Sequence, residues 1–65
     1  MKIVLNGEPR EVRSPSLTDA LAELGFGGAT VATALNGTFV PAPARPATEL
    51  SDGDRLEVLA PRQGG

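Results

Sequence analysis

The sequence predicts a small α+β fold in which one helix packs against a mixed β-sheet. Short stretches of alternating apolar and polar residues flank two Asn-Gly pairs, which is the pattern of β-hairpins. A single stretch with helical periodicity lies between these hairpins, and another alternating stretch follows after residue 54. At 65 residues the chain has room for one domain with one core.

The first hairpin is expected over residues 1–12. The alternating apolar side chains of its first strand are Met1, Ile3 and Leu5. Asn6 and Gly7 tolerate the positive φ angles of a tight turn. Because Pro9 has no N–H to donate to a ladder, the second strand, around residues 10–13, is expected at an edge of the sheet.

The helix is expected within residues 14–25. Its apolar side chains recur at i, i+3, i+4 and i+7 and form one stripe, made of Leu17, Ala20, Leu21 and Leu24. Ser16 is expected to cap the N-terminus, with Asp19 as its capping-box partner. Gly25 suits the left-handed residue that ends a helix, and Phe26 would then pack back on the stripe. Because so short a helix is not stable alone, its apolar stripe is expected to pack against the sheet.

A second hairpin is expected over residues 30–40, with Asn36-Gly37 as its turn. Ala32 and Ala34 share one of its faces. The segment 41–49 is expected to be a stiff connecting loop, because three prolines in six residues remove backbone donors and restrict φ.

The last strand is expected over residues 55–60, after a turn at residues 51–54. Asp52 and Asp54 flank a glycine in that turn, so we interpret them as turn residues and not as a metal or acid–base pair. Leu56 and Val58 should face the helix, which leaves Leu59 on the other face.

This order of elements predicts a β-grasp, or ubiquitin-like, fold with four to five strands and one helix across one face of the sheet. The first and last strands would pair in parallel at its centre. We expect a domain over residues 1–60 and a flexible tail over residues 61–65. The opposite sheet face would stay open. On it, the predicted docking surface for a partner consists of Leu59, Val4, Ala32 and Ala34.

The composition excludes most side-chain chemistry. The chain has no Cys, His, Trp or Tyr, which excludes zinc fingers, thiol nucleophiles and Ser-His-Asp triads. We therefore expect no catalytic residue, no bound metal and no bound cofactor. A net charge of −2 with only two aromatic residues argues against a nucleic-acid partner. The N-terminus has too short an apolar run for a signal peptide, and no stretch is long enough for a membrane span, so we expect a cytoplasmic location and no membrane partner. On its own the chain is expected to be a monomer.

The Gly64-Gly65 pair is the most informative feature for function. Two residues without side chains can enter a narrow channel and place the α-carboxylate in the active site of another protein. That carboxylate is ionised at neutral pH and needs activation, for example as an acyl-adenylate, before a nucleophile attacks it. With sulfur as the nucleophile the product is a thiocarboxylate. The alternative is an unselected chain end without function.

Four segments together resemble the ThiS family of sulfur carriers in thiamin biosynthesis. They are residues 1–8 (MKIVLNGE), residues 34–37 (ALNG) with Val40-Pro41, residues 52–58 (DGDRLEV) and Gln63-Gly64-Gly65. The resemblance covers nearly the whole chain. After Val40-Pro41, where relatives often have Arg and then Trp, this chain has Ala42 and Arg45, which leaves the partner contacts of that loop open.

The resemblance implies that Gly65 is adenylated by an E1-like enzyme, ThiF, which uses ATP. A sulfur donor enzyme would then complete the thiocarboxylate, and thiazole synthase, ThiG, would receive the sulfur. Arg62, Gln63 and Gly64 would be needed for entry into the partner's active site. The chain would thus be a substrate and not an enzyme. Alternatives are a MoaD-like carrier for molybdopterin or another sulfur metabolite, a ubiquitin-like modifier and an interaction-only module.

Overall fold

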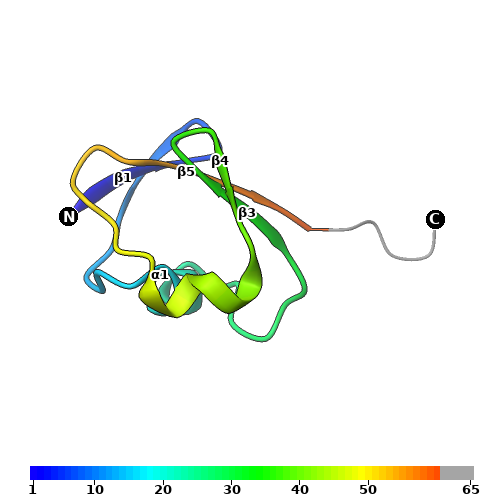
Figure 1. Cartoon of the computed structure of the whole chain (residues 1–65). Helices are drawn as coiled ribbons and strands as arrows, with labels where there is room; N and C mark the ends of the chain where they lie inside the picture. The colour runs from blue at the N-terminus through cyan, green and yellow to red at the C-terminus, as the bar shows by residue number, and fades with distance from the viewer. Residues whose placement is uncertain (61–65) are drawn as a thin grey trace.

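The computed structural model describes residues 1–60, which form a five-stranded mixed sheet with two helical segments beneath it (Figure 1). The elements are β1 (Lys2–Leu5), β2 (Glu8–Glu11), α1 (Leu17–Glu23), β3 (Ala32–Leu35), β4 (Thr38–Val40), the 3-10 helix η1 (Ala42–Ala47) and β5 (Arg55–Leu59). The strand order is β2-β1-β5-β3-β4. The predicted tail, residues 61–65, lies outside the described residues.

The central strand pair confirms the predicted β-grasp arrangement. β1 and β5 are parallel and lie in the middle of the sheet, whereas β1 with β2, β3 with β4 and β3 with β5 are antiparallel. α1 and η1 lie on one side of the sheet, and the opposite face is left open (Figure 1). No helix within residues 1–60 is long and apolar enough to cross a membrane.

Both Asn-Gly pairs form the predicted hairpin turns. The φ angles are 48° at Asn6 and 87° at Gly7, and 51° at Asn36 and 84° at Gly37. Positive φ at both central residues is the type I′ geometry, whose twist matches that of the flanking strands. β2 is an edge strand, as Pro9 predicts, and all four of its residues are exposed. It begins at Glu8 and ends at Glu11, earlier than the predicted residues 10–13, because Glu8 pairs with Leu5 directly across the two-residue turn.

The stripe of α1 faces the sheet and builds the core. Leu17, Ala20 and Leu21 are buried, and the partly buried Leu24 packs against them. The predicted C-terminal cap is present: the Phe26 N–H donates to the Leu21 carbonyl at 2.8 Å, around a Gly25 with φ of 94°. The buried apolar residues are Ile3, Leu5, Val12, Leu17, Ala20, Leu21, Val40, Leu50, Leu56 and Val58.

The prediction that Ser16 caps α1 through its side chain is wrong. Ser16 is the residue before the helix, but its side chain makes no capping hydrogen bond. It forms instead a short antiparallel bridge with Glu49. The Leu17 N–H donates to the Thr48 carbonyl at 2.9 Å, and the Leu50 N–H donates to the Pro15 carbonyl at 2.7 Å. The backbone of a distant segment therefore fixes the start of the helix.

Most of the segment predicted as a loop is the 3-10 helix η1. The Ala44 N–H donates to the Pro41 carbonyl at 2.9 Å, and the Thr48 N–H to the Arg45 carbonyl at 3.1 Å. The φ angle that a proline ring imposes, near −65°, lies within the range of a 3-10 helix. The prolines therefore favour this helix while preventing an α-helical ladder. Leu50, just after this segment, is buried and anchors its end in the core.

Glu23 links the connection after β2 to the end of α1. Its carboxylate accepts hydrogen bonds from the Arg13 N–H at 2.9 Å, the Ser14 N–H at 2.7 Å and the Ser14 hydroxyl. The Ser14 hydroxyl bond, followed by the Arg13 backbone bond, lowers the pKa of Glu23. Because its pKa is lower in the folded state, the ionised Glu23 carboxylate adds to the free energy of unfolding. This contribution is fully present above the unfolded-state pKa of about 4.3 and is lost as the pH falls through the folded-state pKa.

Glu23→Gln is therefore expected to lower the thermal midpoint at neutral pH, with a difference from the wild type that narrows as the pH falls below about 4.3. Thermal unfolding followed by circular dichroism at several pH values measures this. Glu11→Gln, at an exposed position of β2, is the matched control. If the difference in thermal midpoint between wild type and Glu23→Gln stayed the same at every pH, the result would contradict the stabilising role of this carboxylate.

Candidate functional site

The two faces of β5 separate core residues from exposed ones. Leu56 and Val58 are buried against the helical layer, whereas 70% of the Leu59 surface is exposed. This confirms the predicted alternation. Leu59 pairs with Ala32 on β3, and Glu57 pairs with Ala34. A large exposed leucine thus lies at the end of the strand that leads toward residues 61–65.

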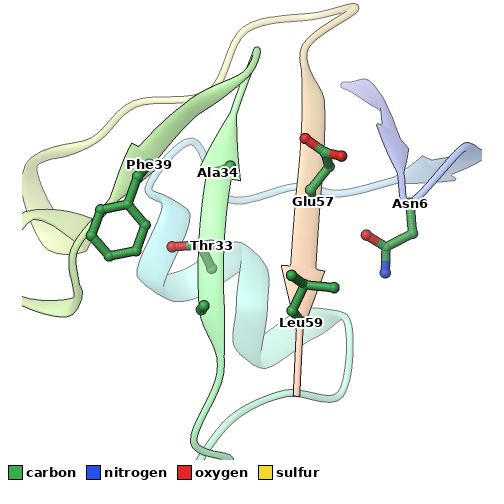
Figure 2. Close-up of a pocket in the computed structure, with 7 residues that line it drawn as sticks. Asn6, Thr33, Ala34, Phe39, Glu57 and Leu59 are labelled. Carbon is green, nitrogen blue, oxygen red and sulfur yellow. The ribbon is translucent and has the colours of Figure 1, made fainter. Parts of the chain in front are cut away.

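An apolar hollow surrounds Leu59 on the open face of the sheet. We use "the open-face hollow" for the site lined by Asn6, Ala32, Thr33, Ala34, Phe39, Glu57 and Leu59. Figure 2 shows Leu59 and Glu57 on β5 and Phe39 on β4, with Ala34 on the strand between them. The small alanine side chains of β3 leave the depression between Leu59 and Phe39.

The structure changes the membership of the predicted docking surface. Val4 is opposite Arg55 in the β1–β5 register, whereas Leu59 is four residues further along β5, roughly 13 Å away. Val4 lines a neighbouring hollow, which shares Asn6 and Glu57 with the open-face hollow but does not include Leu59. It therefore does not adjoin Leu59, because β1 ends before β5 does. Ala32 and Ala34 do line the open-face hollow.

Sequence reasoning missed Phe39 as a member of this surface. Phe39 is 64% exposed and pairs with Ala34 across β3 and β4. An exposed aromatic residue between Thr38 and the buried Val40 follows from strand alternation, so the signal was present in the sequence. Its approach to Leu59 depends on the strand order β5-β3-β4, which no local pattern specifies.

The predicted structural role of Asp52 and Asp54 agrees with their contacts. Asp52 Oδ1 accepts from the Lys2 N–H at 2.7 Å. Asp54 Oδ2 accepts from the Ser51 N–H at 2.7 Å, and its Oδ1 accepts from Asn36 Nδ2 at 3.0 Å. These bonds close the turn before β5. Within residues 1–60 no group of acidic residues is arranged to hold a metal ion.

Arg45 connects η1 to the strand beneath the open-face hollow. Its Nη2 donates to the Val31 carbonyl at 2.6 Å, and its Nε donates to Thr33 Oγ1 at 3.1 Å. Thr33 is itself buried and donates to the Val40 carbonyl at 2.8 Å. The guanidinium therefore binds β3 and the residue before it, and the Thr33 hydroxyl in turn binds β4.

The predicted reactive group and its neighbours, Arg62, Gln63, Gly64 and Gly65, lie outside the described residues. The sequence model of the ThiS family matches residues 3–65, which include them. The chain belongs to the ThiS family. It is 41% identical over 61 residues to the sulfur carrier protein ThiS of Thermus thermophilus, an alignment that covers 94% of this chain and 95% of that protein.

Two solved structures support the same family assignment. The crystal structure of the thiamine biosynthesis protein ThiS from Geobacter metallireducens has a TM-score of 0.82 and 33% identity, with both chains covered completely. An NMR structure of a thiamine biosynthesis protein from that organism has a TM-score of 0.80 and 32% identity, covering 100% of this chain and 88% of that one. These similarities confirm the predicted family and the β-grasp fold.

A further relative is a larger protein. A thiazole synthase of Paramagnetospirillum magneticum is 38% identical over 66 residues, which cover 100% of this chain but only 20% of that protein. This chain thus spans one fifth of the thiazole synthase and nearly all of the Thermus carrier. As a member of the ThiS family, it is a sulfur carrier of thiamin biosynthesis.

Proposed function

We propose that the α-carboxylate of Gly65 carries the sulfur. One of its oxygens attacks the α-phosphorus of ATP, pyrophosphate leaves, and an acyl-adenylate forms. Sulfide delivered by a donor enzyme then attacks the carbonyl carbon, and AMP leaves. The product is a thiocarboxylate whose sulfur can be transferred to an acceptor. Activation is required because a carboxylate with a pKa of about 3.5 is ionised at neutral pH and resists nucleophiles.

The observation that carries this proposal is the family match, which extends through Gly64 and Gly65. Composition supports it, since a chain without Cys has no side-chain thiol on which to carry sulfur. Glycine at both positions offers no side chain that would obstruct a narrow channel. Arg62 and Gln63 would connect the domain to these glycines during entry. In this role the chain is a substrate of other enzymes and binds no cofactor of its own.

We further propose three partners. A ThiF-like adenylyltransferase binds the ATP and activates Gly65, a sulfur donor enzyme supplies the sulfur, and a ThiG-like thiazole synthase receives it. The similarity to a segment of a protein named thiazole synthase supports the last of these. A monomeric state and a cytoplasmic location stay predictions.

The open-face hollow is the surface that we propose the activating enzyme covers. It is mainly apolar and lies at the end of β5, the strand that precedes the reactive tail. A partner seated there would hold the domain while residues 61–65 enter its active site. Leu59, Ala32 and Ala34 keep their predicted docking role in this proposal, Phe39 is added, and Val4 lies outside the hollow.

Intact-mass measurement tests the proposed function. The purified chain is incubated with a ThiF-like enzyme, ATP and a sulfur source. We expect a mass gain equal to the replacement of one oxygen by sulfur, together with release of AMP and pyrophosphate. Omission of ATP is the control and should abolish the gain. A chain that is neither adenylated nor loaded with sulfur would contradict the proposal.

Two of the three alternatives predict a different result in the same experiment. A ubiquitin-like modifier would form isopeptide bonds with lysines and appear as conjugates of higher mass. An interaction-only module would show no change in mass, and a MoaD-like carrier would be loaded but would give its sulfur to another acceptor. The family match and the Thermus relative favour the thiamin carrier over all three.

A further inference from the structure

Asn6 holds the end of β5 through its side chain. Its Oδ1 accepts from the Val58 N–H at 2.9 Å, and its Nδ2 donates to the Val58 carbonyl at 3.1 Å. Both polar backbone groups of Val58 therefore point toward β1, and one side-chain amide binds both. Val58 directly precedes Leu59 of the open-face hollow, and Asn6 also lines this hollow (Figure 2).

The Asn6 side chain supplies a hydrogen-bond acceptor that the backbone of β1 would supply if the strand continued. Along the parallel pair, the Val4 N–H donates to the Asp54 carbonyl and the Asn6 N–H to the Leu56 carbonyl, each at 2.9 Å. In a continued ladder the next acceptor, for the Val58 N–H, would be the carbonyl of Asn6 itself. The turn begins there, with φ of 48° at Asn6, and Oδ1 takes the place of that carbonyl.

Asn36 makes a comparable contact at the opposite end of β5. The Asn36 N–H donates to the Arg55 carbonyl at 2.8 Å, and Asn36 Oδ1 accepts from the Arg55 N–H at 2.9 Å. The side chains of the two Asn-Gly turns thus hold the central strand at its two ends. Only the Asn6 end lies next to Leu59 and the segment that continues to Gly65.

We infer that Asn6 is a positioning residue for the activation of Gly65, acting by holding Val58 and Leu59 in place. This inference rests on the proposed function. Leu59 belongs to the proposed docking surface, and the tail continues from the same strand end. Asn6 therefore fixes the strand end from which the chain continues toward the reactive carboxylate. A misplacement of about 1 Å at a reacting group can cost ~100-fold in rate.

The test compares Asn6→Gly with Asn36→Gly. Glycine adopts positive φ without strain, so both variants keep a turn-compatible backbone. Asn6→Gly loses the two side-chain bonds to Val58, and Asn36→Gly loses the side-chain bonds to Arg55 and Asp54. Adenylation by a ThiF-like enzyme is followed as pyrophosphate release over a range of carrier concentrations, at a temperature where both variants are folded. Amide hydrogen exchange at Val58 and Arg55 reports the two strand ends separately.

For Asn6→Gly we expect faster exchange at Val58 and a kcat about tenfold lower, with a KM within about threefold of the wild type. For Asn36→Gly we expect faster exchange at Arg55 and a kcat within about twofold of the wild type. A positioning role lowers kcat, whereas loss of a direct contact between Asn6 and the enzyme would raise KM.

Several results would overturn the inference. These are unchanged exchange at Val58, equal kcat values in the two variants, or a raised KM with unchanged kcat in Asn6→Gly. A wild-type chain that is not adenylated would instead overturn the proposed function, and this inference with it. A reactive wild type with an equally reactive Asn6→Gly variant leaves the proposed function intact and overturns only the positioning role.

Discussion

A chain that ends at Gly64 is expected to gain no sulfur. Deletion of Gly65 moves the terminal carboxylate back by one residue, about 3.5 Å of extended chain. Because a misplacement of about 1 Å can cost ~100-fold, adenylation should fall by more than ~100-fold. The measurement is the mass gain on incubation with a ThiF-like enzyme, ATP and a sulfur source.

The fold should be unaffected by this deletion, since every contact in residues 1–60 is retained. Equal thermal midpoints of the full and shortened chains therefore serve as the control. Gly65→Ala keeps the chain length and the terminal carboxylate but adds a methyl group. It therefore distinguishes the effect of moving the carboxylate from the effect of a side chain too wide for the channel. Normal sulfur loading of the shortened chain would contradict the assignment of Gly65 as the carrier group.

Leu59→Glu is expected to weaken activation strongly without unfolding the domain. Leu59 is 70% exposed, so the exchange removes little of the core, but it places a charge in the open-face hollow. A buried anchor residue at an interface is typically worth about 2 kcal/mol or more, which corresponds to roughly 30-fold in affinity. We expect kcat/KM for adenylation to fall by about 30-fold, mainly through KM.

Thr38→Glu is the matched control for this exchange. It also introduces one carboxylate at an exposed strand position, but beside the turn of β3 and β4 and outside the lining of the open-face hollow. It should retain kcat/KM within about twofold of the wild type. If Leu59→Glu kept the kcat/KM of the wild type for adenylation, at equal thermal stability, the result would contradict the proposal that the activating enzyme covers this surface.

Structural features that depend on the conformational preferences of a few neighbouring residues could be predicted from the sequence. The two Asn-Gly turns, the stripe of α1 and the Gly25 cap depend on conformations that the residues themselves favour, and all three are present. The edge position of β2 was predictable because Pro9 has no backbone N–H to donate to a neighbouring strand. In each case the physical preference acts within a few residues, so no tertiary contact was needed to detect it.

Most of the errors concern residues whose partners are distant in the sequence. Ser16 has the side chain of a helix cap, but pairing with Glu49 decides how α1 begins. Val4 and Leu59 both suit an open sheet face, yet the β1–β5 register separates them. Phe39 joins Leu59 only because β3 lies between β4 and β5. Register and strand order depend on the whole sheet and not on any one segment.

The sequence by itself determined the fold class and the family resemblance, and the proposed chemistry at the Gly65 carboxylate rests on that resemblance and on the Gly64-Gly65 ending. The tertiary structure decided which residues surround the strand that leads to that carboxylate. Asn6 is a turn residue in the sequence, but its side-chain amide binds Val58, 52 positions away. Such a contact exists only after β1 and β5 have paired, because pairing brings the turn beside the strand end.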